Sequence, residues 1–267
     1  MMQYINIDFQ KEKRMKKQPL FIAFSNQKGG MGKSAFTVLV AGYFHYQKGQ
    51  NVLVVDCDYP QFSIRSMRER DKQVVEKTDA YKQLMIAQYE RIQKKAYTVL
   101  SAKPEEAKET ADRFLEKSEV EYDLVFFDLP GTVNSNGIFR SIINMDHIFV
   151  PITMDRMVMQ SSLSFATTLK DFISTHPDAP LKGLHLFWNK VDKRVSKELF
   201  HLYSEIMERL SLDVLQTVVP DTQRYSKELS QTGKVFFRST LFPPPESQLK
   251  DSGLVEIVDE IVQITSK

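Results

Sequence analysis

Residues 27–34 read Gln-Lys-Gly-Gly-Met-Gly-Lys-Ser, and this segment stands between the apolar run Leu20–Phe24 and a helical pattern that stops at Gly49. Glycines let the backbone curl with its N–H groups toward an anion, and a helix beginning near Lys33 adds the positive end of its dipole. In this setting Lys33 reaches the β- and γ-phosphates of a nucleotide, and the Ser34 hydroxyl ligates Mg²⁺. The segment therefore predicts a strand, a phosphate-binding loop and a helix, with these nucleotide ligands: Gly29, Gly30, Met31, Gly32, Lys33, Ser34 and Ala35.

The same alternation of apolar runs and helical patterns continues along the chain. Further apolar runs lie at residues 51–58, 122–131, 147–153, 181–190 and 214–220, and helical patterns such as Met157–Thr175 and Ser196–Leu210 separate them. Continuous apolar strands are typical of parallel sheets that are buried on both faces. The sequence predicts an α/β fold of the P-loop NTPase type, in which helices flank a doubly wound, mostly parallel sheet.

Two segments depart from this pattern. Residues 1–18 hold five basic side chains and no apolar period, which predicts a mobile basic leader before a single P-loop ATPase domain over residues 19–267. Residues 66–118 are rich in Lys, Glu, Gln and Ala, and Pro104 divides them into two helical candidates. We expect a helical insertion there, either a solvated hairpin over one sheet edge or an element that contacts a partner.

Composition limits the possible classes of protein. With 267 residues, 42% hydrophobic and 26% charged, the chain is an ordinary globular one, and the single cysteine, Cys57, excludes an intramolecular disulfide or a multi-cysteine metal site within one chain. The apolar runs are far shorter than the ~18 residues that span a bilayer. We expect a cytoplasmic protein without stable membrane association. A net charge of +2 leaves the partner open.

Acidic side chains end two of the predicted strands. Asp56 and Asp58 close the run at 51–58, and Asp128 closes the run at 122–131. Ligands of open parallel sheets bind at the carboxyl ends of the strands, so Asp128 can hold Mg²⁺ through a water molecule. Solubility of the strand end or capping of a helix is the alternative for these acids, Asp56 and Asp128 included. Cys57 points away from its acidic neighbours, which indicates a buried, inert thiol.

Another predicted strand ends in Asn189-Lys-Val-Asp192. The pattern Asn-Lys-x-Asp at this place is the guanine-reading motif of many GTPases, so GTP remains an alternative to ATP.

Three motifs together resemble those of a known family. The segment Ser25-Asn-Gln-Lys-Gly-Gly-Met-Gly-Lys-Ser34 resembles the deviant Walker A motif of the ParA and MinD group of ATPases, whose early lysine corresponds to Lys28. Residues 54–58 with Pro60-Gln61 resemble the second acidic motif of that group, and residues 124–131 resemble its Walker B strand and switch loop. The resemblance covers about residues 20 to 240.

The resemblance implies a homodimer formed on ATP binding, in which Lys28 reaches the partner's ATP. It implies ATP and Mg²⁺ as ligands, Lys28, Lys33, Asp58 and Asp128 as catalytic residues, and Ser34, Asp56 and Asp128 as the metal site. Asp58 would position the attacking water, Asp56 would support the solvent shell of the metal, and Asn189 and Pro220 would line the adenine site. Here Tyr59 intervenes before Pro60, where the group has Asp-x-Asp-Pro-Gln, so we expect slow or conditional hydrolysis.

Several functions share such a site. An iron protein of the nitrogenase type needs two cysteines per subunit, which this chain lacks. A MinD-like membrane positioner needs a basic amphipathic helix, whereas Leu249–Lys267 is acidic with one apolar stripe and is expected to dock on the domain. A small-molecule ATP-dependent ligase of the dethiobiotin synthetase type would need a substrate motif, and none is visible.

A ParA-like ATPase for DNA partition or conjugative transfer fits best, with a ParB-like or transfer protein as its stimulating partner. Its ATP-bound dimer would bind DNA without sequence preference through phosphate contacts. The expected DNA-binding residues are Arg224, Lys227, Lys234 and Arg238, with Lys193, Arg194 and Lys197 as further candidates. An ordinary solvated surface is the alternative for these charges, and cargo or membrane positioning is the alternative function.

Overall fold

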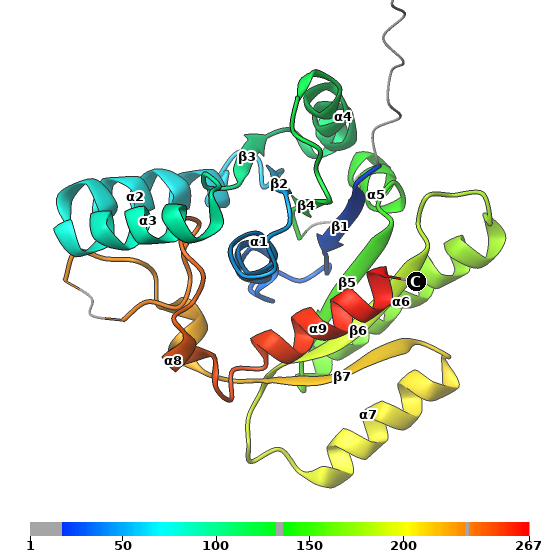
Figure 1. The fold of residues 1–267 in the computed structure, drawn as a ribbon. Coiled ribbons are helices and arrows are strands. Elements are labelled where there is room, and N and C mark those ends of the chain that lie inside the picture. The colour runs from blue at the N-terminus through cyan, green and yellow to red at the C-terminus, as the bar shows by residue number, and fades with distance from the viewer. Residues whose placement is uncertain (1–17, 132–135, 233–234, 267) are drawn as a thin grey trace, which may run out of the picture.

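Every apolar run that predicted a strand forms one. The computed structural model describes residues 18–131, 136–232 and 235–266, and its seven strands pair in parallel in the order β3-β2-β4-β1-β5-β6-β7 (Figure 1). The bounds are β1 (Leu20–Phe24), β2 (Val52–Asp56), β3 (Thr98–Ser101), β4 (Leu124–Asp128), β5 (His147–Ile152), β6 (Gly183–Val191) and β7 (Asp213–Pro220). The predicted α/β class with a doubly wound sheet is confirmed.

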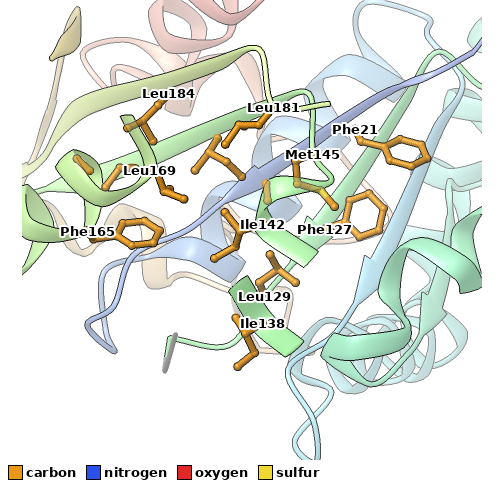
Figure 2. Packing of buried hydrophobic residues seen from close by; sticks show 14 of the residues in the cluster. Phe21, Phe127, Leu129, Ile138, Ile142, Met145, Phe165, Leu169, Leu181 and Leu184 are labelled. Atoms are coloured by element: carbon orange, nitrogen blue, oxygen red, sulfur yellow. The ribbon is translucent and has the colours of Figure 1, made fainter. Parts of the chain in front are cut away.

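Helices cover both faces of this sheet. On one face lie α1 (Lys33–Tyr46), α2 (Ser63–Lys77) and α9 (Leu254–Thr265); on the other lie α4 (Ala107–Lys117), α5 (Asn136–Ile143), α6 (Arg156–Thr175) and α7 (Lys197–Arg209). Successive strand side chains point to opposite faces, so Ile22 and Phe24 pack toward α1 while Phe21 and Phe127 join the core under α5 and α6 (Figure 2). Burial on both faces explains the continuous apolar runs.

The expectation of a purely helical insertion at residues 66–118 was wrong in one respect. The segment contains α2, α3 (Asp79–Ile92), η1 (Pro104–Glu106) and α4, but β3 lies between them and pairs with β2 at the edge of the sheet. Sequence patterning missed β3 because Thr-Val-Leu-Ser is four residues long and only half-buried. No residue of α3 is buried, and Leu84, Ile86 and Tyr89 are exposed on it. The predicted leader lies outside the described residues apart from Gln18.

The last helix docks on the domain as the sequence predicts. Leu254, Ile257, Val258 and Ile261 of α9 are buried in the core that α1 covers. The carboxylate of Glu260 accepts hydrogen bonds from the backbone amides of β7 at Gln216 (2.8 Å) and Thr217 (2.7 Å). Two short elements, η2 (Gln223–Ser226) and α8 (Glu246–Leu249), connect β7 to α9. Among the described residues, the helices are too short or too polar to cross a membrane.

A histidine pair between β5 and β6 makes stability depend on pH. Nδ1 of His147 lies 3.3 Å from Nε2 of His185. Burial lowers the pKa of His147 to about 4, and the neighbouring His185 contributes. In the unfolded chain this histidine takes up a proton near pH 6.5. We therefore expect the free energy of unfolding to fall between pH 6.5 and 4 by roughly 1–2 kcal/mol through this residue, less than the full shift because water partly screens the ring.

Urea unfolding of the wild type and of His147→Gln at pH 7.5 and 5.0 measures this effect. The variant is expected to lose less stability on acidification than the wild type. An equal loss in both proteins would show that other groups carry the pH dependence.

Candidate nucleotide-binding site

A cavity opens at the carboxyl ends of the strands, where β1 lies between β4 and β5. Its volume of about 590 Å³ falls in the range of ligand sites. Its walls are formed at the carboxyl ends of four strands, by residues 29–35 after β1, 129–131 after β4, 189–190 near the end of β6, and 220–223 and 225–226 at and after the end of β7. Asp58 and Arg238 complete the lining. This is the position at which open parallel sheets bind ligands.

The loop after β1 has the conformation of a phosphate cradle. Gly32 has a φ of +86°, in the left-handed region that favours glycine, and α1 begins at the next residue, Lys33. A Cβ on Gly131 would lie 2.9 Å from Nζ of Lys33, so the loop after β4 approaches this lysine closely. The amide of Asn26 fixes the base of the loop by donating to the Pro151 carbonyl (2.7 Å) and the Ser162 hydroxyl (2.8 Å).

Lys33 is a buried cation held at the cavity wall. Its Nζ donates to the carbonyl of Lys28 at 3.3 Å. Burial lowers the pKa of Lys33, while the nearby carboxylates of Asp128 and Asp58 oppose this shift. A phosphate group in the cavity would supply the acceptors that a desolvated ammonium lacks.

Asp128 and Ser34 fit the magnesium site that the sequence predicts. Asp128 is fully buried, and neither carboxylate oxygen has a hydrogen-bond partner among the described residues. Burial raises the pKa of Asp128 to about 7, and repulsion from Asp56 and Asp58 adds to this increase. The Ser34 hydroxyl lowers the pKa of Asp128, although the two side chains do not meet the geometry of a hydrogen bond. A buried carboxylate without donors calls for a cation, so the residues present fit Mg²⁺.

Asp56, the last residue of β2, and Asp58, two residues later, have different surroundings. Asp58 lines the cavity, as a water-positioning residue must. Asp56 pairs in register with Asp128 but is fully buried, and its carboxylate accepts from the backbone amides of Arg65 (2.9 Å) and Asp58 (3.3 Å). Burial raises the pKa of Asp56 in spite of these hydrogen bonds. The structure thus gives Asp56 the alternative task of holding the start of α2, and a metal role for it remains a prediction.

Residues at the end of β6 brace the loop. Nδ2 of Asn189 donates to the Met31 carbonyl at 2.9 Å, and Nζ of Lys190 donates to the Gly30 carbonyl at 2.8 Å. Asp192 does not line the cavity; its carboxylate accepts from Nε of Arg194 at 2.9 Å. Because a guanine-reading site needs that aspartate in the pocket, the geometry favours ATP over GTP. Pro220 lines the cavity as expected.

Residues 22–235 match the model of the family described as the CobQ/CobB/MinD/ParA nucleotide binding domain. The chain belongs to this family. The predicted membership of the ParA and MinD group is confirmed, and the family belongs to the P-loop NTPases, for which ATP and Mg²⁺ are consistent ligands. A search of curated proteins finds no match.

Solved structures with the same fold include three of stated function. Cobyrinic acid a,c-diamide synthase from Mycobacterium smegmatis, with a bound ATP analogue and magnesium, has a TM-score of 0.58 at 19% identity over 92% of this chain and 95% of its own. The cell division ATPase MinD of Pyrococcus furiosus has a TM-score of 0.57 at 13% identity. A plasmid partition protein of Borrelia burgdorferi bound to AMPPNP has a TM-score of 0.54 at 14% identity. Each of these two aligns over 92% of this chain and 100% of its own. At such identities the likeness shows the fold alone.

Lys28 and Lys33, the two lysines of the phosphate loop, differ in their surroundings. The side chain of Lys28 is exposed, and its ammonium has no hydrogen-bond or ion-pair partner within residues 18–131, 136–232 and 235–266. Lys28 stands at the loop entrance, before the lining begins at Gly29. A cation in this position can meet an anion outside its own subunit.

The structure describes three of the four predicted DNA-binding residues and gives them different surroundings. Nη1 of Arg224 donates to the carbonyls of Gln248 (2.8 Å) and Lys250 (2.7 Å), so this arginine fastens α8. Arg238 lines the nucleotide cavity and pairs with Glu228 at 2.6 Å. Lys227 is exposed, and Lys234 lies outside the described residues. Backbone carbonyls thus engage Arg224, and a carboxylate engages Arg238, while DNA binding by these residues stays a prediction.

Sequence reasoning also missed Asn26, Lys190 and Tyr225 as site residues. Asn26 and Lys190 belong to the quoted motifs, and their place at strand ends was the available signal. Tyr225 lies beside Phe36 of α1, with 5.5 Å between the ring centroids, and it lines the cavity. Its role depends on a loop contact that no motif marks.

Proposed function

We propose that this protein is an ATPase switch in which ATP and Mg²⁺, bound in the cavity, bring two copies together. The observation that carries the proposal is the pair of lysines in one loop. Lys33 is buried and faces the cavity, whereas Lys28 is exposed and has no partner in the described part of the chain. Two cations with these surroundings suit one nucleotide in the same subunit and one in the partner.

Each residue of the site then has a definite task. The loop amides and Lys33 bind the phosphates, and Ser34 and Asp128 hold Mg²⁺. When bound, Mg²⁺ neutralises charge on the phosphate oxygens. Asp58 orients the attacking water at the cavity edge. Hydrolysis is slow, because Tyr59 interrupts the motif that fixes this aspartate. A ParB-like or transfer protein stimulates it.

The proposed output of the switch is DNA binding without sequence preference, for partition or conjugative transfer. Lys193 and Lys197 follow β6, and Lys227 follows β7 and η2; all three are exposed. Since β6 and β7 are parallel, these lysines lie at the edge of the sheet that carries the cavity. Dimerisation doubles their number, and counterion release makes DNA affinity rise steeply with the number of phosphates contacted.

A mobility-shift assay over a salt series, with ATP, ADP or no nucleotide, tests this output. We expect the ATP form alone to bind unrelated duplexes about equally. The triple variant Lys193→Glu, Lys197→Glu, Lys227→Glu is expected to weaken binding at least tenfold and to flatten the salt dependence. The triple variant Lys77→Glu, Lys95→Glu, Lys117→Glu reverses the same number of exposed charges away from the cavity and is the matched control.

Two outcomes would contradict DNA binding as the output. Equal DNA affinity with ATP, with ADP and without nucleotide would show that the nucleotide does not control DNA binding. No binding at low salt leaves a partner-protein or cargo-positioning role, or ligase chemistry on a small molecule. A membrane-positioning role has little support, because the apolar stripe of α9 is buried in the domain core.

A further inference from the structure

Arg238 lies in the cavity wall with unused hydrogen-bonding capacity. A guanidinium carries five N–H donors. In Arg238 the side chain is 20% exposed and Nη2 donates to Glu228 at 2.6 Å, while Nε is buried without a partner among the described residues. Buried donors are rarely left unpaired, so a guanidinium only partly used at the wall of a ligand cavity needs an explanation.

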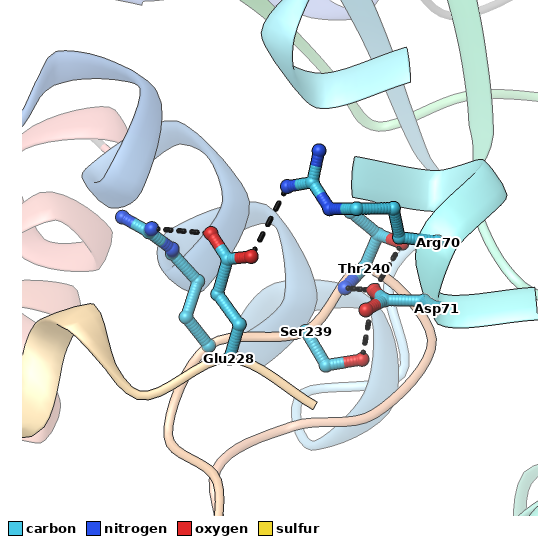
Figure 3. A network of polar contacts seen from close by, with 6 residues as sticks. Arg70, Asp71, Glu228, Ser239 and Thr240 are labelled. Carbon is cyan, nitrogen blue, oxygen red and sulfur yellow. Dashed lines mark hydrogen bonds and ion pairs between the residues drawn. The ribbon is translucent and has the colours of Figure 1, made fainter. Parts of the chain in front are cut away.

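The surrounding contacts fix the position of this arginine. Its backbone N–H donates to the carbonyl of Lys227 at 3.0 Å, and Glu228 is shared with Arg70 of α2 at 3.1 Å. The next residues are tied to the same helix, because the carboxylate of Asp71 accepts from the Ser239 hydroxyl (3.1 Å) and the Thr240 amide (2.6 Å) (Figure 3). Arg238 is therefore held at the cavity without any ligand, as a preorganised recognition residue is.

We propose that Arg238 contacts the nucleoside half of the bound nucleotide and is a specificity-determining residue of this site. The inference rests on the proposed binding of ATP. The contact is a charge-assisted hydrogen bond from the guanidinium to an acceptor of the ribose or the base. Glu228 is the positioning residue that keeps the guanidinium at the wall.

The sheet order indicates which half of the nucleotide lies there. The phosphate loop follows β1, while Arg238 is bonded to the segment after η2, which continues from β7. Two strands, β5 and β6, lie between β1 and β7, which makes a separation of roughly 14 Å at the usual strand spacing. With its phosphates on the loop, an extended nucleotide places its nucleoside toward β6 and β7, where Tyr225 also lines the wall.

Calorimetric titration of the full chain with MgATP and with magnesium tripolyphosphate, which has no nucleoside, tests this assignment. Arg238→Met is expected to weaken ATP binding about tenfold and to leave tripolyphosphate binding unchanged. Arg238→Lys is expected to keep part of the ATP affinity. Arg209→Met, which removes an exposed arginine that pairs with Glu205 at the end of α7, is the matched control and is expected to bind both ligands like the wild type.

Three results would overturn the assignment. The first is ATP affinity that neither Arg238 variant changes. The second is an equal loss for ATP and tripolyphosphate, which would place the effect on the phosphates or on the fold. The third is a loss in Arg209→Met as large as in Arg238→Met. A wild type that binds neither ligand removes the proposed function together with this inference, whereas a wild type that binds ATP separates the two.

Discussion

Alanine in place of Lys33 is expected to abolish nucleotide binding. The variant removes the one cation buried in the loop, whose Nζ lies at the cavity wall between the switch loop and the carbonyl of Lys28. It also leaves the carboxylates of Asp128 and Asp58 without the ammonium that opposes their charge, so these carboxylates would repel the triphosphate more strongly. We expect MgATP affinity to fall at least a hundredfold, about 2.7 kcal/mol, in calorimetric titration.

The control for this experiment lies just beyond the same helix. Lys48 follows α1 and pairs with Asp259 on the surface at 2.9 Å, so Lys48→Ala should leave ATP affinity unchanged. Unchanged affinity in Lys33→Ala would contradict the nucleotide site itself. A wild type that prefers GTP would contradict the assignment of ATP, which depends on Asp192 lying outside the cavity.

The sequence was most informative where chemistry depends on neighbours in the chain. Gly29 to Ser34 form one turn and the start of one helix, so their spacing alone determines where the amides and Lys33 point. Asp58 and Asp128 could be placed because parallel strands end at a common edge. The buried stripe of α9 could be predicted because its helical period is local.

Contacts between distant segments could not be predicted in the same way. The basic residues between Pro220 and Thr240 look alike in the sequence, yet Arg224 binds carbonyls near α8, and Arg238 lies at the cavity beside Glu228. Asp56 could act on a metal or cap a helix, and the contact with the Arg65 amide, 2.9 Å from its carboxylate, could not be predicted from the sequence. The short strand β3 was missed because an edge strand needs little apolar surface.

ATP is expected to convert the wild type from monomer to dimer, and Lys28→Ala is expected to remain monomeric while still binding ATP. The reason is that the Lys28 ammonium is exposed and has no partner in the described part of the chain, so its loss costs the dimer a charge-assisted contact but leaves the cavity intact. Asp58→Ala should stay dimeric for much longer than the wild type, because it lacks the carboxylate that positions water yet retains Lys33, Ser34 and Asp128. Light scattering with MgATP over time measures all three proteins.

Lys28→Ala tests the formation of the dimer, and Asp58→Ala tests the activation of water, so light scattering on both variants distinguishes these two steps. Lys28→Arg keeps a cation at the loop entrance and is expected to dimerise at least in part. If the wild type stays monomeric at saturating ATP, the nucleotide does not act through dimerisation in this protein. If Lys28→Ala dimerises as the wild type does, the exposed lysine serves another contact. If Asp58→Ala dissociates as fast as the wild type, water activation lies with a different residue, and the register that Tyr59 shifts is the first place to look for it.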